Sequence, residues 1–320
     1  MRAAAAARPS AVAPFPGASG RLIHATGIGS RVPPAFSGRV HSVYRQACNI
    51  ETSGGMLVTL LSGALGNLPR GVLCSAVEAM DFRTLCSVSQ TVECLGAELR
   101  ISGPGVMVDL SSAAVWRCEV SACLTDLSDD RTVGILFDLR TTLSEPDAPP
   151  GGFAPLILGN DESASLLDRA MQRRLERALP VLAAAIDRFD ADRAVDALAL
   201  LVGLGPGLTP SGDDFIVGLL AALWTRYDCR VLIAKLHEPL ARLAATSHPI
   251  SRQFLLDALD GEFSEPLSDM AVAFSACDRE GAAMAVRRAM RIGHTSGSDA
   301  LTGFLFGMEP ALVRERAVIN

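Results

Sequence analysis

A short pattern occurs twice in this chain of 320 residues, and its residue types are those that hold small polar ligands. The copies begin at Ser211 and Ser296, 85 positions apart, and share the spacing Ser-Gly-x-Asp-x-x-x-Gly-x-Leu. A Ser followed three residues later by an acid, just before an apolar run, is also typical of a capped helix start. Both interpretations place Asp214 and Asp299 in the first turn of a helix.

Three features favour a ligand site over simple capping. The glycine after each serine leaves backbone amides open to close approach, as anion-binding loops at helix starts require. In each copy the acid and the second glycine lie four residues apart and share a helix face. Asp213 adds another carboxylate to the first copy. Because two helix starts share one design, we predict that they lie close together and line a common pocket.

Carboxylates at a helix N-terminus are held ionised by the helix dipole and by capping hydrogen bonds. They suit three roles: accepting from a ureido or amide N–H, holding Mg²⁺, or plain capping. We assign the metal role to Asp213 and Asp214. His294 precedes the second copy, where it donates to an oxyanion or moves a proton, or is an exposed residue without a role. The catalytic candidates are Asp213, Asp214, Asp299 and His294.

The first copy follows a loop of alternating glycines, residues 203–210. A dinucleotide-binding loop would need a third glycine where Leu208 stands, so this loop serves another purpose. A third helix start spans residues 246–251, whose hydroxyls either add to the pocket or only cap the helix. The substrate-binding candidates are Gly205, Gly207, Thr209, Ser211, Gly212, Thr246, Ser251, Ser296 and Gly297.

The segments 203–215, 246–251, 261–263 and 293–299 closely resemble the AllH family, and the resemblance covers roughly residues 36–308. That family is described as a subunit of oxamate carbamoyltransferase in allantoin breakdown. The resemblance implies an enzyme component that interconverts oxalurate plus phosphate with oxamate plus carbamoyl phosphate, together with other subunits. Backbone amides at 211–214 and 296–299 would hold the anionic substrate, while the acids orient its N–H groups or Mg²⁺.

Carbamoyl transfer needs no organic cofactor, only orientation and donors aimed at the developing oxyanion. The Ser-x-Arg-Thr-Arg motif of the aspartate and ornithine carbamoyltransferases is absent here. Either the family uses another solution, or the chemistry lies on a partner subunit. The alternative is therefore a non-catalytic binding or scaffolding subunit that senses an anionic metabolite.

Composition excludes other classes of function. A net charge of −6 and a pI near 5.4 argue against nucleic acid, which demands a basic surface. No apolar run approaches the length of a membrane helix, so we expect no membrane partner and a cytoplasmic protein. The eight cysteines lack disulfide or zinc spacing and indicate buried free thiols.

The change in hydrophobic period along the chain predicts an α+β fold. We expect a disordered lead-in at residues 1–35, a β-rich region at 36–145 and a linker at 146–154. A mostly α-helical region at 155–320 carries the glycine-rich motifs. Runs 85–89 and 133–139 are among the expected strands, and run 197–202 fits either a helix or a buried strand. Pro180 should kink or end the helix that contains it.

Overall fold

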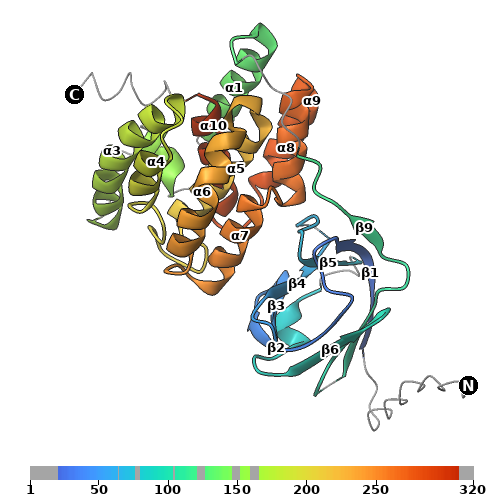
Figure 1. Cartoon of the computed structure of the whole chain (residues 1–320). Helices are drawn as coiled ribbons and strands as arrows, with labels where there is room; N and C mark the ends of the chain where they lie inside the picture. Colours follow the sequence, from blue (N-terminus) through green and yellow to red (C-terminus); the bar gives the residue numbers. More distant parts are fainter. Residues whose placement is uncertain are drawn as a thin grey trace, which may run out of the picture.

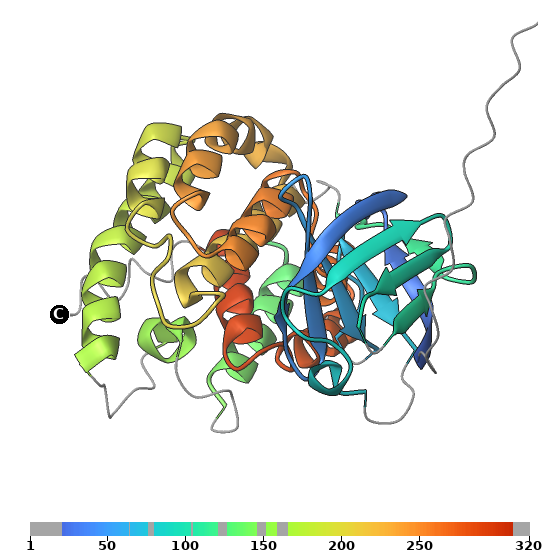
Figure 2. The ribbon, with the colours of Figure 1, turned by 90° about the horizontal axis from the view of Figure 1, so that it is seen from below.

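The computed structural model describes residues 21–63, 65–75, 80–103, 105–120, 127–145, 152–158 and 166–309. A β-barrel and a helical region pack side by side, with the barrel coloured blue to teal in Figure 1. Figure 2 shows that helices α3 (Leu166–Asp187) and α4 (Ala191–Leu198) lie on the side of the helical region away from the barrel. The predicted α+β class is confirmed.

Residues 21–116 build the barrel. Its strands follow the order β5-β4-β3-β2-β6-β7-β8-β1, and β1 pairs back with β5 to close eight strands into a barrel. The short β9 pairs in parallel with the end of β1. The strands are β1 (Arg21–Gly29), β2 (Ala35–Val43), β3 (Ala47–Thr52), β4 (Leu57–Ser62), β5 (Gly71–Cys74), β6 (Thr91–Leu95), β7 (Glu98–Ile101), β8 (Val106–Asp109) and β9 (Ala114–Trp116).

Alternating side chains fill the barrel interior, as the two-residue period of a strand requires. In β6, Val92 and Cys94 point inward while their neighbours are exposed. Ile50, Leu60 and Leu99 are fully buried in the same core. The cysteines of the described residues are free, most of them buried, in keeping with the expectation from spacing.

The sequence misplaced the ends of the β-rich region. Strand β1 occupies residues 21–29, inside the predicted disordered lead-in, while residues 1–20 lie outside the described part. Run 85–89 is a turn between a 3-10 helix (Phe82–Thr84) and β6. Run 133–139 belongs to helix α1 (Asp130–Leu143), because Asp129 caps its start and Thr132, Ile135 and Leu139 are buried at helical spacing.

The helical region begins earlier than the predicted linker allows, since α2 occupies the last residues of segment 146–154, of which 146–151 lie outside the described part. Run 197–202 ends α4 and continues into turns, so the buried-strand alternative is wrong. Helix α3 continues through Pro180 and does not end there. The remaining helices are α2 (Phe153–Leu158), α5 (Ser211–Thr225), α6 (Arg230–Ala244), α7 (Pro249–Leu259), α8 (Glu265–Ser275), α9 (Arg279–Ala289) and α10 (Ser296–Met308).

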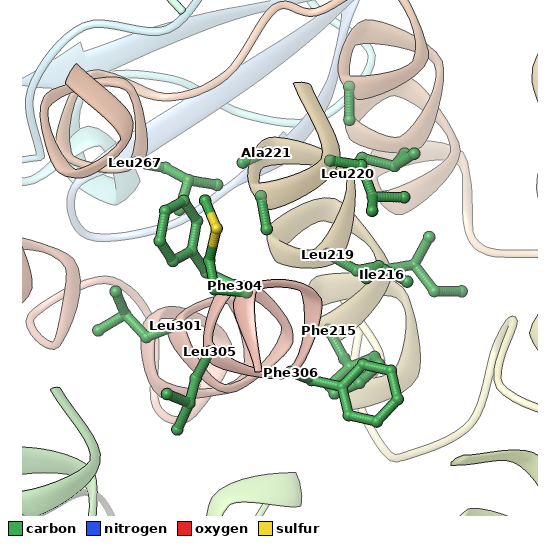
Figure 3. Close-up of a cluster of buried hydrophobic side chains, with 14 of the residues drawn as sticks. Phe215, Ile216, Leu219, Leu220, Ala221, Leu267, Leu301, Phe304, Leu305 and Phe306 are labelled. Carbon is green, nitrogen blue, oxygen red and sulfur yellow. The ribbon is translucent and has the colours of Figure 1, made fainter. Parts of the chain in front are cut away.

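Helices α5 and α10, which carry the two copies of the motif, form the centre of the helical region. Their apolar side chains pack together (Figure 3). The rings of Phe215 and Phe306 are tilted by 52° with 5.5 Å between their centroids. A Cβ at Gly218 would overlap the carbonyl oxygen of Ala300. A Cβ at Gly303 would likewise overlap the carbonyl oxygen of Phe215. The second glycine of each copy therefore lets the two backbones touch.

These contacts reveal an approximate two-fold repeat. Gly218 corresponds to Gly303 in the motif, and Phe215 corresponds to Ala300, so each glycine meets the other helix at the equivalent position. The repeat extends upstream, where Asp190 and Asp278 cap the preceding helices α4 and α9. The residue before each cap has positive φ. The helical region thus contains two versions of one helix–loop–helix unit.

Charged side chains join the barrel to the helical region. Arg70 of the barrel donates to Asp257 of α7 at 2.8 Å, and Arg31 donates to Glu262 at 2.9 Å. The backbone and side-chain nitrogens of Asn67 both donate to Glu265 at 2.7 Å. These contacts bring the barrel wall opposite the helix starts. Among the described residues, no helix is long and apolar enough to cross a membrane.

Candidate functional site

A cavity of about 410 Å³ lies between the barrel and the helical region. Its helical wall includes residues at the starts of α5, α7, α8 and α10, together with the ends of α7 and α9 and the loops that follow them. Its opposite wall is formed by β3, β4 and the loop before β5. Four helix N-termini with partial positive charge and two helix C-termini with partial negative charge therefore border one space. Both motif copies contribute, through Thr209 and Asp214 on one side and Ser296 and Gly297 on the other.

The two helix starts meet directly. The hydroxyl groups of Thr209 and Ser296 form a hydrogen bond of 2.8 Å across the gap between them. This contact and the shared cavity confirm the prediction that the two copies lie together and line one pocket. The residues that carry the pocket are separated by more than 80 positions in the chain, and the packing of α5 against α10 unites them.

Asp214 is the acid that the repeated motif presents to this cavity. Its side chain is only 7% exposed, and its Oδ2 atom has no hydrogen-bond partner. Burial raises the pKa of Asp214 well above its ordinary value, and the charges of Asp299 and Asp213 raise it further. The hydroxyl groups of Ser296 and Thr209 oppose this rise. Burial of Asp214 therefore works against the sequence-based expectation of an acid held ionised by the helix start.

Asp299 occupies the equivalent position in the second copy. Its Oδ1 atom accepts a hydrogen bond of 2.6 Å from the backbone N–H of Phe153, whereas its Oδ2 atom has no partner. Burial raises the pKa of Asp299 to about 6, against the lowering effect of the Phe153 N–H and of the hydroxyls of Ser211 and Thr295. Asp299 does not line the cavity.

Asp213 has a different environment from its neighbour in sequence. Its carboxylate accepts from the backbone N–H of Gly203 at 2.8 Å and from the Ser251 hydroxyl at 2.7 Å. The hydroxyl of Ser247, which sequence reasoning did not select, donates to the same carboxylate. Asp213 therefore ties the glycine loop and the start of α7 to α5, away from the cavity.

The helix starts are not capped as the motif suggested. Pro210 and Thr295 are the N-cap residues, so Ser211 and Ser296 lie one position inside their helices, and neither N-cap residue makes a side-chain capping bond. The Ser211 hydroxyl interacts with Asp299 and the Ser296 hydroxyl with Asp214, so each serine contacts the acid of the other copy. Several amides expected to hold an anion are already bonded, since Gly212 donates to Leu204 and Gly297 donates to Ile292.

The remaining predicted residues lie outside the cavity lining. Gly205 and Gly207 have positive φ values of 119° and 93° and shape the loop before α5. Thr246 donates its hydroxyl to the Leu243 carbonyl oxygen, at the end of α6. His294 is exposed in the loop before α10. A catalytic role for His294 and a binding role for these loop residues stay predictions.

The arrangement does not suit a magnesium ion held between Asp213 and Asp214. Asp213 is satisfied by its protein donors, and only Asp214 faces the cavity. Throughout the described ranges, no group of three or more His, Cys, Asp or Glu side chains is placed to hold a metal. The magnesium role of Asp213 and Asp214 stays a prediction.

Sequence reasoning missed the acids that the helical region presents opposite the barrel. Asp257 and Glu262 both line the cavity, and Glu262 retains an unpartnered buried Oε2 atom. Burial raises the pKa of Asp257 to about 6, although Arg70 counteracts that rise. Asp257 pairs with Arg70 and Glu262 with Arg31, and both arginines belong to the barrel, far upstream in the chain. The only local signal was the turn at 261–263, which takes part in the family resemblance.

The chain thus combines a closed barrel, a repeated helical unit and a cavity between them. Comparison with known families finds two matches, one in the barrel and one in the helical region. Residues 23–115 match the AllH family N-terminal domain, and residues 201–308 match the model described as oxamate carbamoyltransferase subunit AllH. The chain therefore belongs to the AllH family, as the motifs indicated. No solved structure matches it.

Proposed function

We propose that this chain works with other subunits as an oxamate carbamoyltransferase and that its cavity holds the carbamoyl substrate. The reaction breaks the C–N bond between the carbamoyl group and oxamate in oxalurate and forms a C–O bond to phosphate. A proton passes from phosphate to the oxamate nitrogen. The observation that carries the proposal is the cavity at which both motif copies of an AllH-family chain converge on the buried, half-satisfied Asp214.

The cavity suits a flat ligand that carries both N–H groups and oxygens. Asp214 offers an unpartnered carboxyl oxygen, while Ser296 and Thr209 offer hydroxyls that donate or accept. The starts of α8 and α10, at Ser264 and Gly297, contribute positive potential for an anionic end. Apolar walls around these groups exclude water and strengthen their interactions with a ligand.

A second function, binding without catalysis, is favoured by a specific feature of the cavity. Its lining contains no Lys, Arg or His, counted over the residues that the structure describes. Phosphate and carbamoyl phosphate are normally held by cationic side chains or a metal. The phosphate side of the reaction would then belong to a partner subunit, with this chain holding the oxamate portion.

The test is reconstitution of the purified chain with its partner subunits and measurement of carbamoyl phosphate formed from oxalurate and phosphate. Asp214→Asn keeps the size of the side chain but changes its proton and charge. We expect it to lower kcat by about a hundredfold, the usual effect of removing one polar group that stabilises a transition state. Asp196→Asn, at an exposed position on α4, is the matched control and should retain full activity.

Size-exclusion chromatography of each complex shows whether assembly is intact. Full activity from an intact complex that carries Asp214→Asn would contradict a catalytic role and support the binding or scaffolding function. The same assay after treatment with a chelator tests the magnesium prediction, because a metal-dependent reaction stops and recovers when Mg²⁺ is restored.

A further inference from the structure

The two motif copies form two versions of one acid site. Asp214 lies beside Ser296, and Asp299 lies beside Ser211, so each acid is approached by the serine of the other copy. Since Ser211 corresponds to Ser296 and Asp214 to Asp299, the approximate two-fold axis between α5 and α10 exchanges the two sites. Both acids are more than nine-tenths buried, and both retain an unpartnered Oδ2 atom.

The two sites differ in what lies against the acid. At Asp299 the space is filled by the chain itself, because the backbone N–H of Phe153 donates to Oδ1 at 2.6 Å. The preceding residue, Gly152, has a φ of 75°, and a Cβ there would overlap the Asp299 carboxylate. At Asp214 the corresponding space is the open cavity.

The side chains around each acid fit this difference. Phe215 packs its ring against that of Phe153, with 5.7 Å between centroids, and so helps to fill the Asp299 site. Its counterpart in the other copy is Ala300, which lines the cavity. The large side chain of Phe215 therefore lies at the filled Asp299 site, and the small side chain of Ala300 lies at the open Asp214 site.

We propose that the filled site shows how the open one is used: Asp214 accepts a hydrogen bond from an amide or ureido N–H of the ligand, as Asp299 accepts one from the Phe153 amide. The peptide group of residues 152 and 153 stands in for a planar N–H-bearing ligand that lies flat against the start of a helix. Asp214 is then the residue that selects ligands with an N–H over ligands of the same shape without one. This inference rests on the proposed function, because it assigns the contact that recognises the nitrogen of oxamate or oxalurate.

Oxamate and pyruvate are a matched pair of probes, since they are similar in shape and charge and differ by an NH₂ group in place of CH₃. Calorimetric titration of the full-length chain with each probe measures the preference directly. We expect oxamate to bind about tenfold or more tightly than pyruvate, the usual effect of a buried hydrogen bond to a carboxyl group. Asp214→Leu should reduce the ratio to about one, and Asp196→Asn should leave it unchanged.

Asp214→Asn serves as the second variant, because it keeps one acceptor oxygen and is expected to fold even where leucine does not. It should give an intermediate preference. Equal affinity of the unaltered chain for the two probes, no binding of oxamate, or an undiminished preference in both variants would overturn the inference. The outcome is separate from that of the proposed function: a selective chain in an inactive complex rejects only the reaction, whereas an active complex without selectivity rejects only the role of Asp214.

Discussion

At the scale of single residues, burial governs the behaviour of the acids in this protein. Asp213 and Asp214 are adjacent in sequence, yet one is fully engaged by protein donors and the other faces a cavity with an unpartnered oxygen. Desolvation raises the pKa of both Asp214 and Asp299. A perturbed acid that faces a cavity, as Asp214 does, is typical of ligand-binding and catalytic sites.

Asp299 should make the stability of the protein depend on pH. Its pKa is about 6 in the folded protein, above the value of about 3.9 in an unfolded chain. The folded state therefore binds the proton more tightly, so this stabilisation is complete below about pH 4 and is lost as the pH rises through 6. Relative to the unaltered chain, Asp299→Asn should gain stability by up to about 3 kcal/mol between pH 4 and pH 7.

Urea unfolding at a series of pH values measures this change. Asparagine retains the oxygen that accepts the Phe153 N–H, so the variant isolates the effect of charge. Asp196→Asn, at an exposed position, provides the control and should follow the unaltered chain at every pH. Parallel curves of unfolding free energy against pH for Asp299→Asn and the unaltered chain would contradict the prediction. They would show that ionisation of Asp299 does not destabilise the folded state.

At the scale of elements, the close contact of α5 and α10 determines the site, because it brings the two helix starts together. Gly303→Ala introduces a Cβ that would overlap the Phe215 carbonyl oxygen. Since backbone atoms cannot rotate away, we expect a loss of roughly 3 kcal/mol in the free energy of unfolding, at the upper end of the cost of overpacking. Thermal or chemical denaturation measures it.

Gly134→Ala in α1 is the matched control, because a Cβ there meets nothing within 4 Å. Alanine favours a helix over glycine by about 1 kcal/mol, so this variant should be slightly more stable than the unaltered chain. If Gly303→Ala were as stable as Gly134→Ala, the backbones of α5 and α10 would not touch as the structure shows.

At the scale of the whole molecule, the cavity exists only while the barrel stays docked on the helical region. Arg70 and Asp257 form the more buried of the ion pairs described at this junction, with side chains that are 18% and 6% exposed. Arg70→Met should lower the free energy of unfolding by about 3 kcal/mol, because it leaves a buried carboxylate without its cation. Asp257→Asn in the same chain should recover much of that loss.

A double-mutant cycle over Arg70→Met and Asp257→Asn checks this prediction, with the free energy of unfolding measured for all four proteins. Residues in direct contact normally show a coupling energy of about 0.5–3 kcal/mol. Strictly additive effects would mean that the two side chains do not interact across the junction. Because Arg70 belongs to the barrel and Asp257 to α7, the coupling energy also reports how strongly the two walls of the cavity stabilise each other.

The sequence by itself determined the class of fold, the family and the two helix starts. It could do so because hydrophobic period, glycine spacing and repeated motifs are local properties of the chain. Even the local pattern was ambiguous at residues 133–139, where a run of branched and aromatic side chains fits a strand as well as the helix α1. The Asp129 cap and burial against the other helices together select the helix.

The tertiary structure decided which acid matters and what it faces. Consecutive residues on a helix point about 100° apart, so Asp213 and Asp214 reach different surroundings that no spacing in the sequence identifies. Asp213 meets Ser251, and Asp214 faces a cavity lined by Ser296 and the barrel wall. All of these neighbours lie far from the two acids in the chain. The difference between the filled site at Asp299 and the open one at Asp214 likewise arises from the position of Phe153, because burial and hydrogen bonding depend on neighbours in space.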